Sequence, residues 1–279
     1  MIELEQVSFG YGENQETLSQ VSATIARGEC VLLCGASGCG KTTVTKLING
    51  LIPAFTPGCR LEGRVMVNGL VPRETPMYEL AQRVGSVFQN PKSQFFNLDT
   101  DSELAFGLEN EGRPPEEIRR RVEQVAETLH LQGLRGKNIF SLSGGQKQLL
   151  NLASVMVLQP KVLILDEPTS QLDPIAASDF LATLGKINRE LGTTIILTEH
   201  RLEEAFSFAS RVAVMDGGKL LCLAVFLRAP GGGEEFFDLL HTHVVVAVSF
   251  HCRVGTIARD RTAADERADK RRKRFRTLR

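Results

Sequence analysis

The sequence lacks any long hydrophobic run. Its longest apolar candidate, LLCLAVFL at residues 220–227, falls well short of the roughly 18 residues that a membrane-spanning helix requires. The first ten residues, MIELEQVSFG, also lack the basic segment and following apolar segment of a secretion signal. We therefore expect a chain that neither spans a membrane nor carries a secretion signal.

Cysteine spacings typical of metal sites are also absent. None of the six cysteines forms a CxxC pair, and one of them lies inside a glycine-rich loop. This usage predicts reduced thiols in a cytosolic protein. The cysteines are at positions 30, 34, 39, 59, 222 and 252.

The chain has no net charge, with 33 Lys+Arg and 33 Asp+Glu, but its charges are unevenly distributed. Residues 251–279 hold 11 basic and 4 acidic side chains, whereas residues 1–250 hold 22 basic and 29 acidic ones. The basic tail follows the break APGGGEE and has few apolar residues, which favours a solvated, partly disordered extension. Contact with anionic lipid headgroups or nucleic acid is the alternative.

Residues 1–230 alternate apolar strands with helical segments, which predicts a parallel α/β fold. Three continuous apolar runs that end in polar residues are expected as buried central strands, namely CVLLCG (30–35), VLILDE (162–167) and TTIILTEH (193–200). Helical periodicity between residues 91 and 135 indicates a helical insertion in this core. The segments IELEQVSF and GRVMVNG are expected as antiparallel strands at the rim, and no internal repeat is visible.

A phosphate-binding loop is predicted where the first central strand meets a helix. GASGCGKT at residues 35–42 fits G-x-x-x-x-G-K-[ST] without a mismatch. Its glycines let backbone N–H groups surround phosphate oxygens at a helix start, Lys41 reaches the β and γ phosphates, and Thr42 offers a hydroxyl to Mg²⁺. The predicted ATP-binding residues are Gly35, Ala36, Ser37, Gly38, Cys39, Gly40, Lys41, Thr42 and Thr43.

Two adjacent acids end the strand VLILDE. Ligands of open α/β sheets bind at this edge, and side chains alternate in direction along a strand. We therefore expect Asp166 to face the metal and Glu167 to face an attacking water. Helix capping is the structural alternative for these acids.

The stretch SLSGGQKQLL at residues 141–150 has two interpretations. Ser143 and Gln146 form a capping-box pattern ahead of an apolar helix. A capping box does not need Gly144 and Gly145, however, and glycine pairs are typical of places where another group approaches the backbone closely. Because the first loop already holds one triphosphate, we expect residues 143–146 to bind the nucleotide of another copy or of a similar chain.

These motifs together resemble the ATP-binding subunits of ABC transporters over about residues 1–223. The resemblance implies a P-loop NTPase (RecA-like) core, with an antiparallel β rim and a helical insertion at about 91–157, that uses ATP and Mg²⁺. It also implies catalytic roles for Glu167, His200 and Gln89, and metal contacts from Thr42, Gln89 and Asp166. The signature segment is Leu142, Ser143, Gly144, Gly145 and Gln146, the dimer turn holds Ser170 and Asp173, and Tyr11 is placed to stack on adenine.

Three of these assignments have structural alternatives. Tyr11 can be an exposed turn residue, and His200 can be an ordinary histidine at a strand end. Asp173 precedes Pro174 and is therefore also a good helix N-cap, a role that is compatible with the functional one.

A narrower resemblance lies in VFQNPKSQFFNLDTDSELAFGLEN and TEHRLEEA, which are similar to the ATPases of energy-coupling-factor importers of vitamins and transition-metal ions. It implies a head-to-tail dimer with a second ATP-binding subunit, a transmembrane coupling protein and a substrate-capturing membrane protein, at the cytoplasmic face of the membrane and without nucleic acid. Residues 231–279 match nothing in that pattern and form an atypical extension. The alternatives are a soluble ATPase of DNA repair or translation, and a module that binds ATP without productive turnover.

Overall fold

The computed structural model describes residues 1–12, 16–200 and 202–225. The expected extension at 231–279, with its basic tail, lies outside the described residues. Within the described part of the chain, no helix is both long and apolar enough to cross a membrane.

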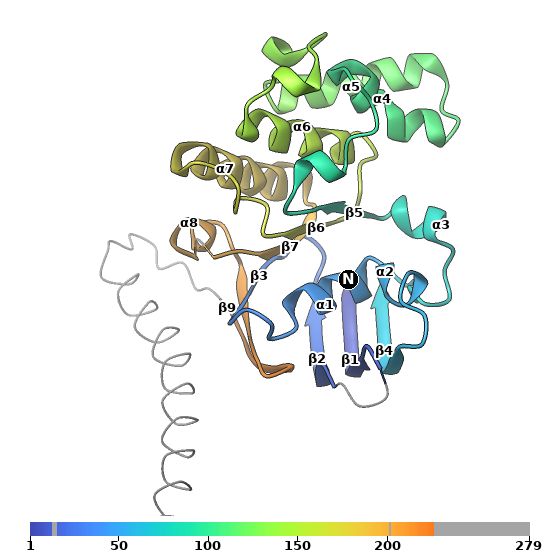
Figure 1. The fold of residues 1–279 in the computed structure, drawn as a ribbon, viewed down its shortest axis with the longest axis vertical. Helices are drawn as coiled ribbons and strands as arrows, with labels where there is room; N and C mark the ends of the chain where they lie inside the picture. Colours follow the sequence, from blue (N-terminus) through green and yellow to red (C-terminus); the bar gives the residue numbers. More distant parts are fainter. Residues whose placement is uncertain (13–15, 201, 226–279) are drawn as a thin grey trace, which may run out of the picture. The chain divides into compact units, whose positions relative to one another are not determined.

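A six-stranded sheet forms the centre of the described structure (Figure 1). Its order is β5-β6-β7-β3-β8-β9, and all neighbours are parallel except the antiparallel pair β8 and β9. The predicted central strands are confirmed as β3, β6 and β7, whose side chains are buried almost throughout. The strands are β3 (Cys30–Gly35), β5 (Val84–Val87), β6 (Val162–Asp166), β7 (Thr194–Thr198), β8 (Arg211–Asp216) and β9 (Lys219–Val225).

A three-stranded antiparallel sheet forms the predicted rim, in the order β2-β1-β4. Its strands are β1 (Ile2–Gly10), β2 (Leu18–Ile25) and β4 (Arg60–Val67). Apolar residues of β1, including Ile2, Leu4 and Phe9, are at most 5% exposed and face the core. Strand β2 lies beside the β8–β9 turn, where Ser19 N donates to the Gly218 carbonyl at 2.9 Å.

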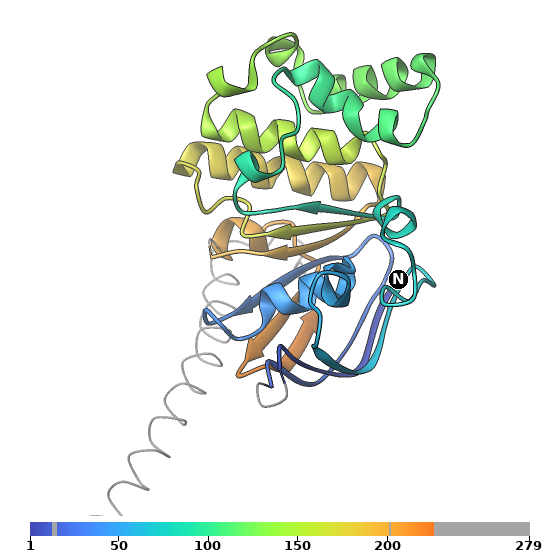
Figure 2. The same ribbon diagram turned by 45° about the vertical axis from the view of Figure 1, so that its right-hand side comes forward.

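Helix α1 (Lys41–Ile48) lies between the two sheets (Figures 1 and 2). It contacts β4 on one side and β3, β6 and β7 on the other, so one core cluster includes side chains from both sheets. Val44, Leu47 and Ile48 are at most 5% exposed there. This packing fixes the start of α1, and with it the phosphate loop, against the sheet. The short helices α2 (Leu51–Ala54) and α3 (Met77–Ala81) follow.

The chain between β5 and β6 is mainly helical, which confirms the predicted insertion. Helix α4 begins at the cap Asp99, whose carboxylate accepts from Ser102 N at 2.9 Å, and α5 has proline at its first position. The helices are α4 (Thr100–Asn110), α5 (Pro115–Thr128) and α6 (Gly144–Met156), with 3-10 turns η1 (Pro91–Ser93), η2 (Gln132–Leu134) and η3 (Ile139–Ser141).

Helix α7 (Pro174–Leu191) lies on the opposite side of the six-stranded sheet from α1 and contacts α6 (Figures 1 and 2). The short helix α8 (Leu202–Phe206) follows β7. Because β3, β6 and β7 are parallel neighbours, their carboxyl ends meet at one edge of the sheet. That edge brings together Gly35, Asp166 and Thr198.

Candidate functional site

The loop after β3 has a backbone that only glycines adopt easily. Gly35, Gly38 and Gly40 have φ values of 149°, 78° and 104°, and Gly40 is the N-cap of α1. A Cβ at Gly35 would collide with the Met215 carbonyl and with the Cys39 thiol. The loop therefore needs glycine both for its conformation and for its close packing on β8.

Lys41 is the first residue of α1, and its side chain turns back over this loop. The residue is only 6% exposed, and its ammonium group donates to the carbonyls of Gly35 at 2.8 Å and Ala36 at 3.1 Å. Ala36, Ser37 and Gly38 form the exposed part of the loop. A buried ammonium behind an exposed glycine-rich loop at a helix start is an arrangement that suits phosphate.

Tyr11 lies next to the phosphate loop. Its hydroxyl is 3.4 Å from the Thr43 hydroxyl, and its ring meets Phe9 edge to face with centroids 4.8 Å apart. The residue is nevertheless 42% exposed. Phe9 and Thr43 thus hold a ring that still has free surface beside the loop, as stacking on a base requires.

Thr42 and Asp166 meet at the edge of the sheet. The Thr42 hydroxyl donates to Asp166 Oδ1 at 3.2 Å, and the hydroxyl of Thr198 donates to the same oxygen at 2.7 Å. One hydroxyl and one carboxylate suit Mg²⁺, which takes few protein ligands and completes its shell with phosphate oxygens and water. No group of three His, Cys, Asp or Glu side chains that could hold a metal ion occurs among the described residues.

Glu167 forms a second group beside the first. Its carboxylate accepts from Gln89 Nε2 at 3.3 Å through Oε2, and its Oε1 lies 2.9 Å from His200 Nε2. Residues 89, 167 and 200 come from three separate loops, each following a different strand of the sheet. The structure therefore brings together the three side chains for which the sequence predicts catalytic roles.

The two acids do face different partners, but strand alternation is not the reason. Strand β6 ends at Asp166, and Glu167 already lies in the following turn with φ of 49°, which is uncommon for a residue other than glycine. Its N–H donates to both the carbonyl and the hydroxyl of Thr198, at 3.0 Å and 2.9 Å. Thr198 thus holds the left-handed turn that separates the two carboxylates.

Sequence reasoning assigned no role to Thr198 or Glu199, although both belong to the run TTIILTEH. Thr198 is fully buried and bonded to both acids, while Glu199 is 4% exposed. The Glu199 carboxylate accepts from Thr169 N and His200 N, each at 3.0 Å. The Glu199 carboxylate thus fixes the backbone position of His200, whose side chain contacts Glu167. The signal that could have found them is two polar residues, Thr198 and Glu199, directly after the apolar run IIL in this stretch.

The capping box at the start of α6 is present. Ser143 Oγ accepts from Gln146 N at 3.3 Å, and Gln146 Oε1 accepts from Ser143 N at 2.9 Å. The two glycines differ from one another. A Cβ at Gly145 would lie 2.9 Å from Ala176 Cβ of α7, so contact within the chain explains this glycine. A Cβ at Gly144 would have no neighbour closer than 3.9 Å, so packing among the described residues does not explain that glycine.

The signature segment and the turn after β6 lie at exposed positions. Leu142 is 5% exposed and anchors the segment, whereas Ser143, Gly144 and Gln146 are exposed. Among the described residues, no hydrogen bond joins the segment to the phosphate loop or to the acids. In the turn, the hydroxyl of Ser170 donates to the Glu167 carbonyl at 2.9 Å. Asp173 caps α7 by accepting from Ala176 N at 3.0 Å, so its predicted capping role is confirmed.

Sequence comparisons identify a large family. A family model described as ABC transporter matches residues 18–170. A Treponema denticola protein named as an ABC transporter ATP-binding protein is 48% identical over 221 residues, which cover 79% of this chain and 45% of that protein. A protein of the same description from Methanosarcina mazei is 42% identical over 222 residues, which cover 79% of this chain and 38% of that protein. The chain thus spans less than half the length of these relatives.

Solved structures agree with this match. CbiO1 from Clostridium perfringens, part of the ABC transporter complex CbiONQ, has a TM-score of 0.74 and 28% identity, covering 92% of this chain and 98% of that chain. The ATP-binding cassette MJ0796, as a dimer bound to ADP and Pi, shares the fold with a TM-score of 0.69, 24% identity and coverage of 82% and 100%. Because the family model spans more than half of the sequence and the relatives exceed 40% identity, the chain belongs to the ABC transporter family.

Proposed function

We propose that this chain is the ATP-hydrolysing motor subunit of a membrane ABC importer of the energy-coupling-factor type, powering uptake of a vitamin or metal ion. The observation that carries the proposal is the convergence of Gln89, Glu167 and His200 beside Thr42 and Asp166 at the mouth of the phosphate loop. The likeness to CbiO1, part of an ABC transporter complex, supports the importer type.

The phosphate loop, the pair Thr42 and Asp166, and the group around Glu167 have different roles. Lys41 and the loop amides bind the phosphates of ATP, and Tyr11 provides a ring for the adenine. Thr42 and Asp166 are the residues that would hold Mg²⁺, which neutralises charge on the β and γ phosphates when it is bound. Since Lys41 donates to two loop carbonyls, its ammonium is already held at the loop before phosphate arrives.

Glu167 is the residue that would orient and deprotonate an attacking water. Its Oε1 lies beside His200 Nε2 and its Oε2 beside Gln89 Nε2, so both oxygens are held by donors from different loops. A carboxylate held from two sides needs little reorganisation when the water loses its proton. Movement of either loop would displace Glu167, which links hydrolysis to the positions of Gln89 and His200.

The contrast between the two glycines of the signature supports a role in trans. Gly144 is exposed and is the first residue of α6, and in the described part of the chain no side chain packs closely enough to require a glycine there. The neighbouring start of α7 also exposes Ile175, which is 77% accessible. We infer that this surface closes over the ATP held by the Lys41 loop of a second ATP-binding subunit. ATP then joins the two subunits, and loss of its γ phosphate releases them. This association and release is a conformational change that can drive a membrane partner.

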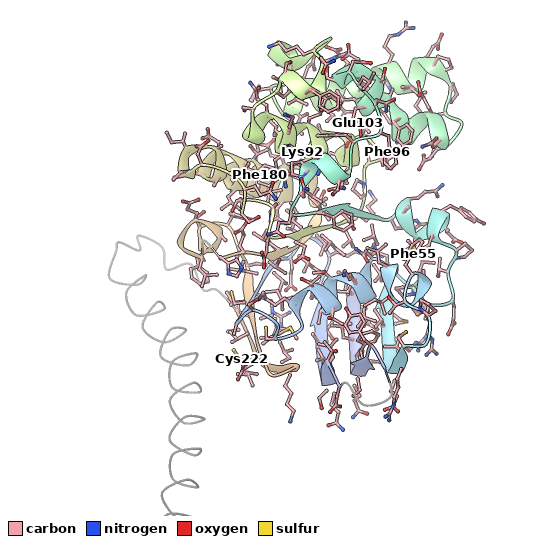
Figure 3. All side chains as sticks on the ribbon, viewed as in Figure 1. Phe55, Lys92, Phe96, Glu103, Phe180 and Cys222 are labelled. Atoms are coloured by element: carbon pink, nitrogen blue, oxygen red, sulfur yellow. The ribbon has the colours of Figure 1, made fainter. Side chains whose placement is uncertain are left out.

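Exposed aromatic side chains offer a contact for that partner. Phe55, Tyr78 and Phe96 are 71%, 74% and 74% exposed, and Figure 3 shows Phe55 and Phe96 on the same side of the view. Phe96 stacks on Phe106 of α4 with centroids 4.8 Å apart, and it follows Gln89 by seven residues. An apolar segment of a transmembrane coupling protein bound there would act on the Gln89 loop. In this proposal the chain works at the cytoplasmic face of the membrane.

The central test changes one charge. Glu167→Gln should retain MgATP binding but lower steady turnover by about a hundredfold or more, because it keeps the shape and removes the base. Lys41→Ala should instead weaken MgATP binding itself. Both are measured on the purified chain, by titration with a fluorescent ATP analogue and by phosphate release. Turnover of Glu167→Gln near the unmodified level would contradict the catalytic assignment.

The trans arrangement is tested by crosslinking. Ser37→Cys and Gln146→Cys are placed on separate chains in a Cys222→Ser background, because Cys222 is an exposed free thiol. We expect links between chains that depend on ATP, measured by gel mobility under non-reducing conditions. A matched control moves the second cysteine from Gln146 to Glu116, which is exposed and precedes the signature by 26 residues. No ATP-dependent link between the two chains, or an equal yield of links in the control pair, would refute the role in trans.

A further inference from the structure

A second cleft lies at the amino-terminal edge of the six-stranded sheet, where the strands begin. The phosphate loop follows the carboxyl end of β3, so this cleft is at the other edge of the sheet from the nucleotide site. It has a volume of about 250 Å³. Its lining residues are Arg27, Asn68, Arg83, Lys161, Gly192 and Thr194.

Backbone hydrogen bonds fix the position of these residues. Arg83 and Lys161 precede the paired strands β5 and β6, and the Arg83 carbonyl accepts from Lys161 N at 3.0 Å. The Lys161 carbonyl accepts from Thr194 N at 3.1 Å, and Thr194 Oγ1 accepts from Gly28 N at 2.9 Å, beside Arg27. Hydrogen bonds therefore connect the backbone segments that carry these three basic residues, although the residues are far apart in sequence.

Within the part of the chain that the structure describes, the three cationic side chains have no partner. Among the described residues, none makes a hydrogen bond or ion pair with the side chains of Arg27, Arg83 or Lys161. The acid nearest to Arg27 in sequence, Glu29, is already engaged, because its Oε2 accepts from Ala26 N at 2.9 Å and from Arg211 Nη1 at 3.2 Å.

Three further charges act near the cleft. The Met1 ammonium donates to Asn68 Oδ1 at 2.8 Å, and burial together with the Arg27 charge lowers the pKa of that amino group against the opposing charge of Glu3. Helix α7 ends at Leu191, and the carbonyls of its last turn contribute about half a negative charge. The charges of Arg27, Arg83 and Lys161 outweigh these two negative contributions, so the cleft attracts anions.

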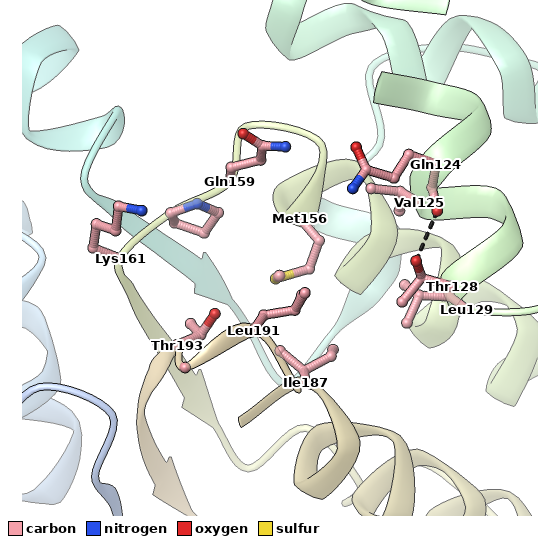
Figure 4. Close-up of a pocket in the computed structure, with 12 residues that line it drawn as sticks. Gln124, Val125, Thr128, Leu129, Met156, Gln159, Lys161, Ile187, Leu191 and Thr193 are labelled. Carbon is pink, nitrogen blue, oxygen red and sulfur yellow. Dashed lines mark hydrogen bonds between the residues drawn. The ribbon is translucent and has the colours of Figure 1, made fainter. Parts of the chain in front are cut away.

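An apolar cavity adjoins the cationic cleft and shares Lys161 and Gly192 with it (Figure 4). Its volume is about 240 Å³, and cavities of about 150 Å³ can hold benzene. Its apolar wall comes from α5, α6 and α7 and the residues that follow them. The side chains of that wall are Val125, Leu129, Met156, Ile187 and Leu191, and the polar side chains at the margin of the cavity are Gln124, Thr128, Gln159, Lys161 and Thr193.

We propose that the two spaces form one binding site for a phosphate ester that carries a compact apolar group. Arg27, Arg83 and Lys161 take the phosphate, for which guanidinium groups offer paired N–H donors of matching geometry. The apolar group enters the neighbouring cavity beside Met156 and Leu191. A soluble phosphate ester and the headgroup region of a bilayer phospholipid share this chemistry, and the experiment below separates them.

Phenyl phosphate is the soluble probe, titrated by calorimetry into the full chain saturated with MgADP so that the phosphate loop is occupied. Replacing one cation should weaken binding about tenfold, because a charged hydrogen bond is removed. Arg83→Gln with Lys161→Gln should therefore weaken it about a hundredfold. The matched control, Arg64→Gln with Lys137→Gln, removes two exposed cations elsewhere and should bind as the unmodified chain does. Binding of MgADP verifies that each variant is folded.

Two further binding measurements identify the class of ligand. Inorganic phosphate should bind at least about tenfold more weakly than phenyl phosphate, since it leaves the apolar cavity unfilled. Vesicles of phosphatidate in phosphatidylcholine, tested by flotation with the same variants, reveal a lipid source. Binding of either probe that is lost in the cleft variant and kept in the control supports the site. Equal binding by both double variants, or binding of neither probe to the unmodified chain, overturns it. Equal affinity for phenyl phosphate and inorganic phosphate would refute the proposed binding of an apolar group in the neighbouring cavity.

Discussion

Thr198→Val is the substitution that most directly tests how the two acids are held. Valine matches the shape of threonine but lacks the hydroxyl that donates to Asp166 Oδ1 at 2.7 Å and accepts from Glu167 N at 2.9 Å. Glu167 N keeps its second acceptor, the Thr198 carbonyl at 3.0 Å, so only the Asp166 contact is lost without replacement. The backbone turn should therefore survive while Asp166 loses one of its two hydroxyl donors.

The size of the effect follows from these contacts. A hydrogen bond to a charged group contributes about 2 kcal/mol, which in a domain of this size corresponds to a fall in Tm of roughly 6 °C. Thr198→Ser keeps the hydroxyl and loses one buried methyl group, at a cost of about 1 kcal/mol. The two variants thus differ little in stability but differ completely in the contact to Asp166.

Turnover separates the two variants. We expect Thr198→Val to lower kcat for MgATP about tenfold, because Asp166 is then positioned by the Thr42 hydroxyl alone. Thr198→Ser should stay within about twofold of the unmodified chain, since its hydroxyl still reaches the carboxylate. Phosphate release at saturating MgATP and scanning calorimetry give both quantities. If the two variants have the same kcat, the Thr198 hydroxyl does not position the acids.

Two other predictions concern the signature glycines and the thiols. Gly144→Asp should preserve MgATP binding and Tm while abolishing turnover. Gly145→Ala should lower Tm, because its new Cβ would lie 2.9 Å from Ala176 Cβ. A fall in Tm for Gly144→Asp but not for Gly145→Ala would contradict the different roles assigned to the two glycines. Burial raises the pKa of the Cys30 and Cys34 thiols to about 12, so iodoacetamide at pH 8 should modify exposed Cys222 and leave both unlabelled until urea unfolds the chain, as measured by peptide mass spectrometry. Early labelling of Cys34 would show that the sheet opens locally.

Much of the fold can be predicted from local pattern. The strands β3, β6 and β7 are continuous apolar runs, and a run of that kind has few alternatives beside a glycine-rich turn. The start of α6 is equally local, since Ser143 and Gln146 cap one turn of helix. Local pattern was less reliable at the acids, because the end of β6 depends on a left-handed residue at Glu167, which no spacing rule indicates.

The features that were missed depend on which strands become neighbours. Thr198 reaches Asp166 because β6 and β7 pair in a register that sets these two residues side by side. Arg83 and Lys161 meet for the same reason at the other edge, where β5 pairs with β6, although 78 positions separate them in sequence. Such pairings are long-range, so no window along the chain contains them. The two edges also differ in motif content. The carboxyl edge carries spacings that sequence reading detects, whereas the cationic cleft draws single basic residues from separate connections and has no motif of its own.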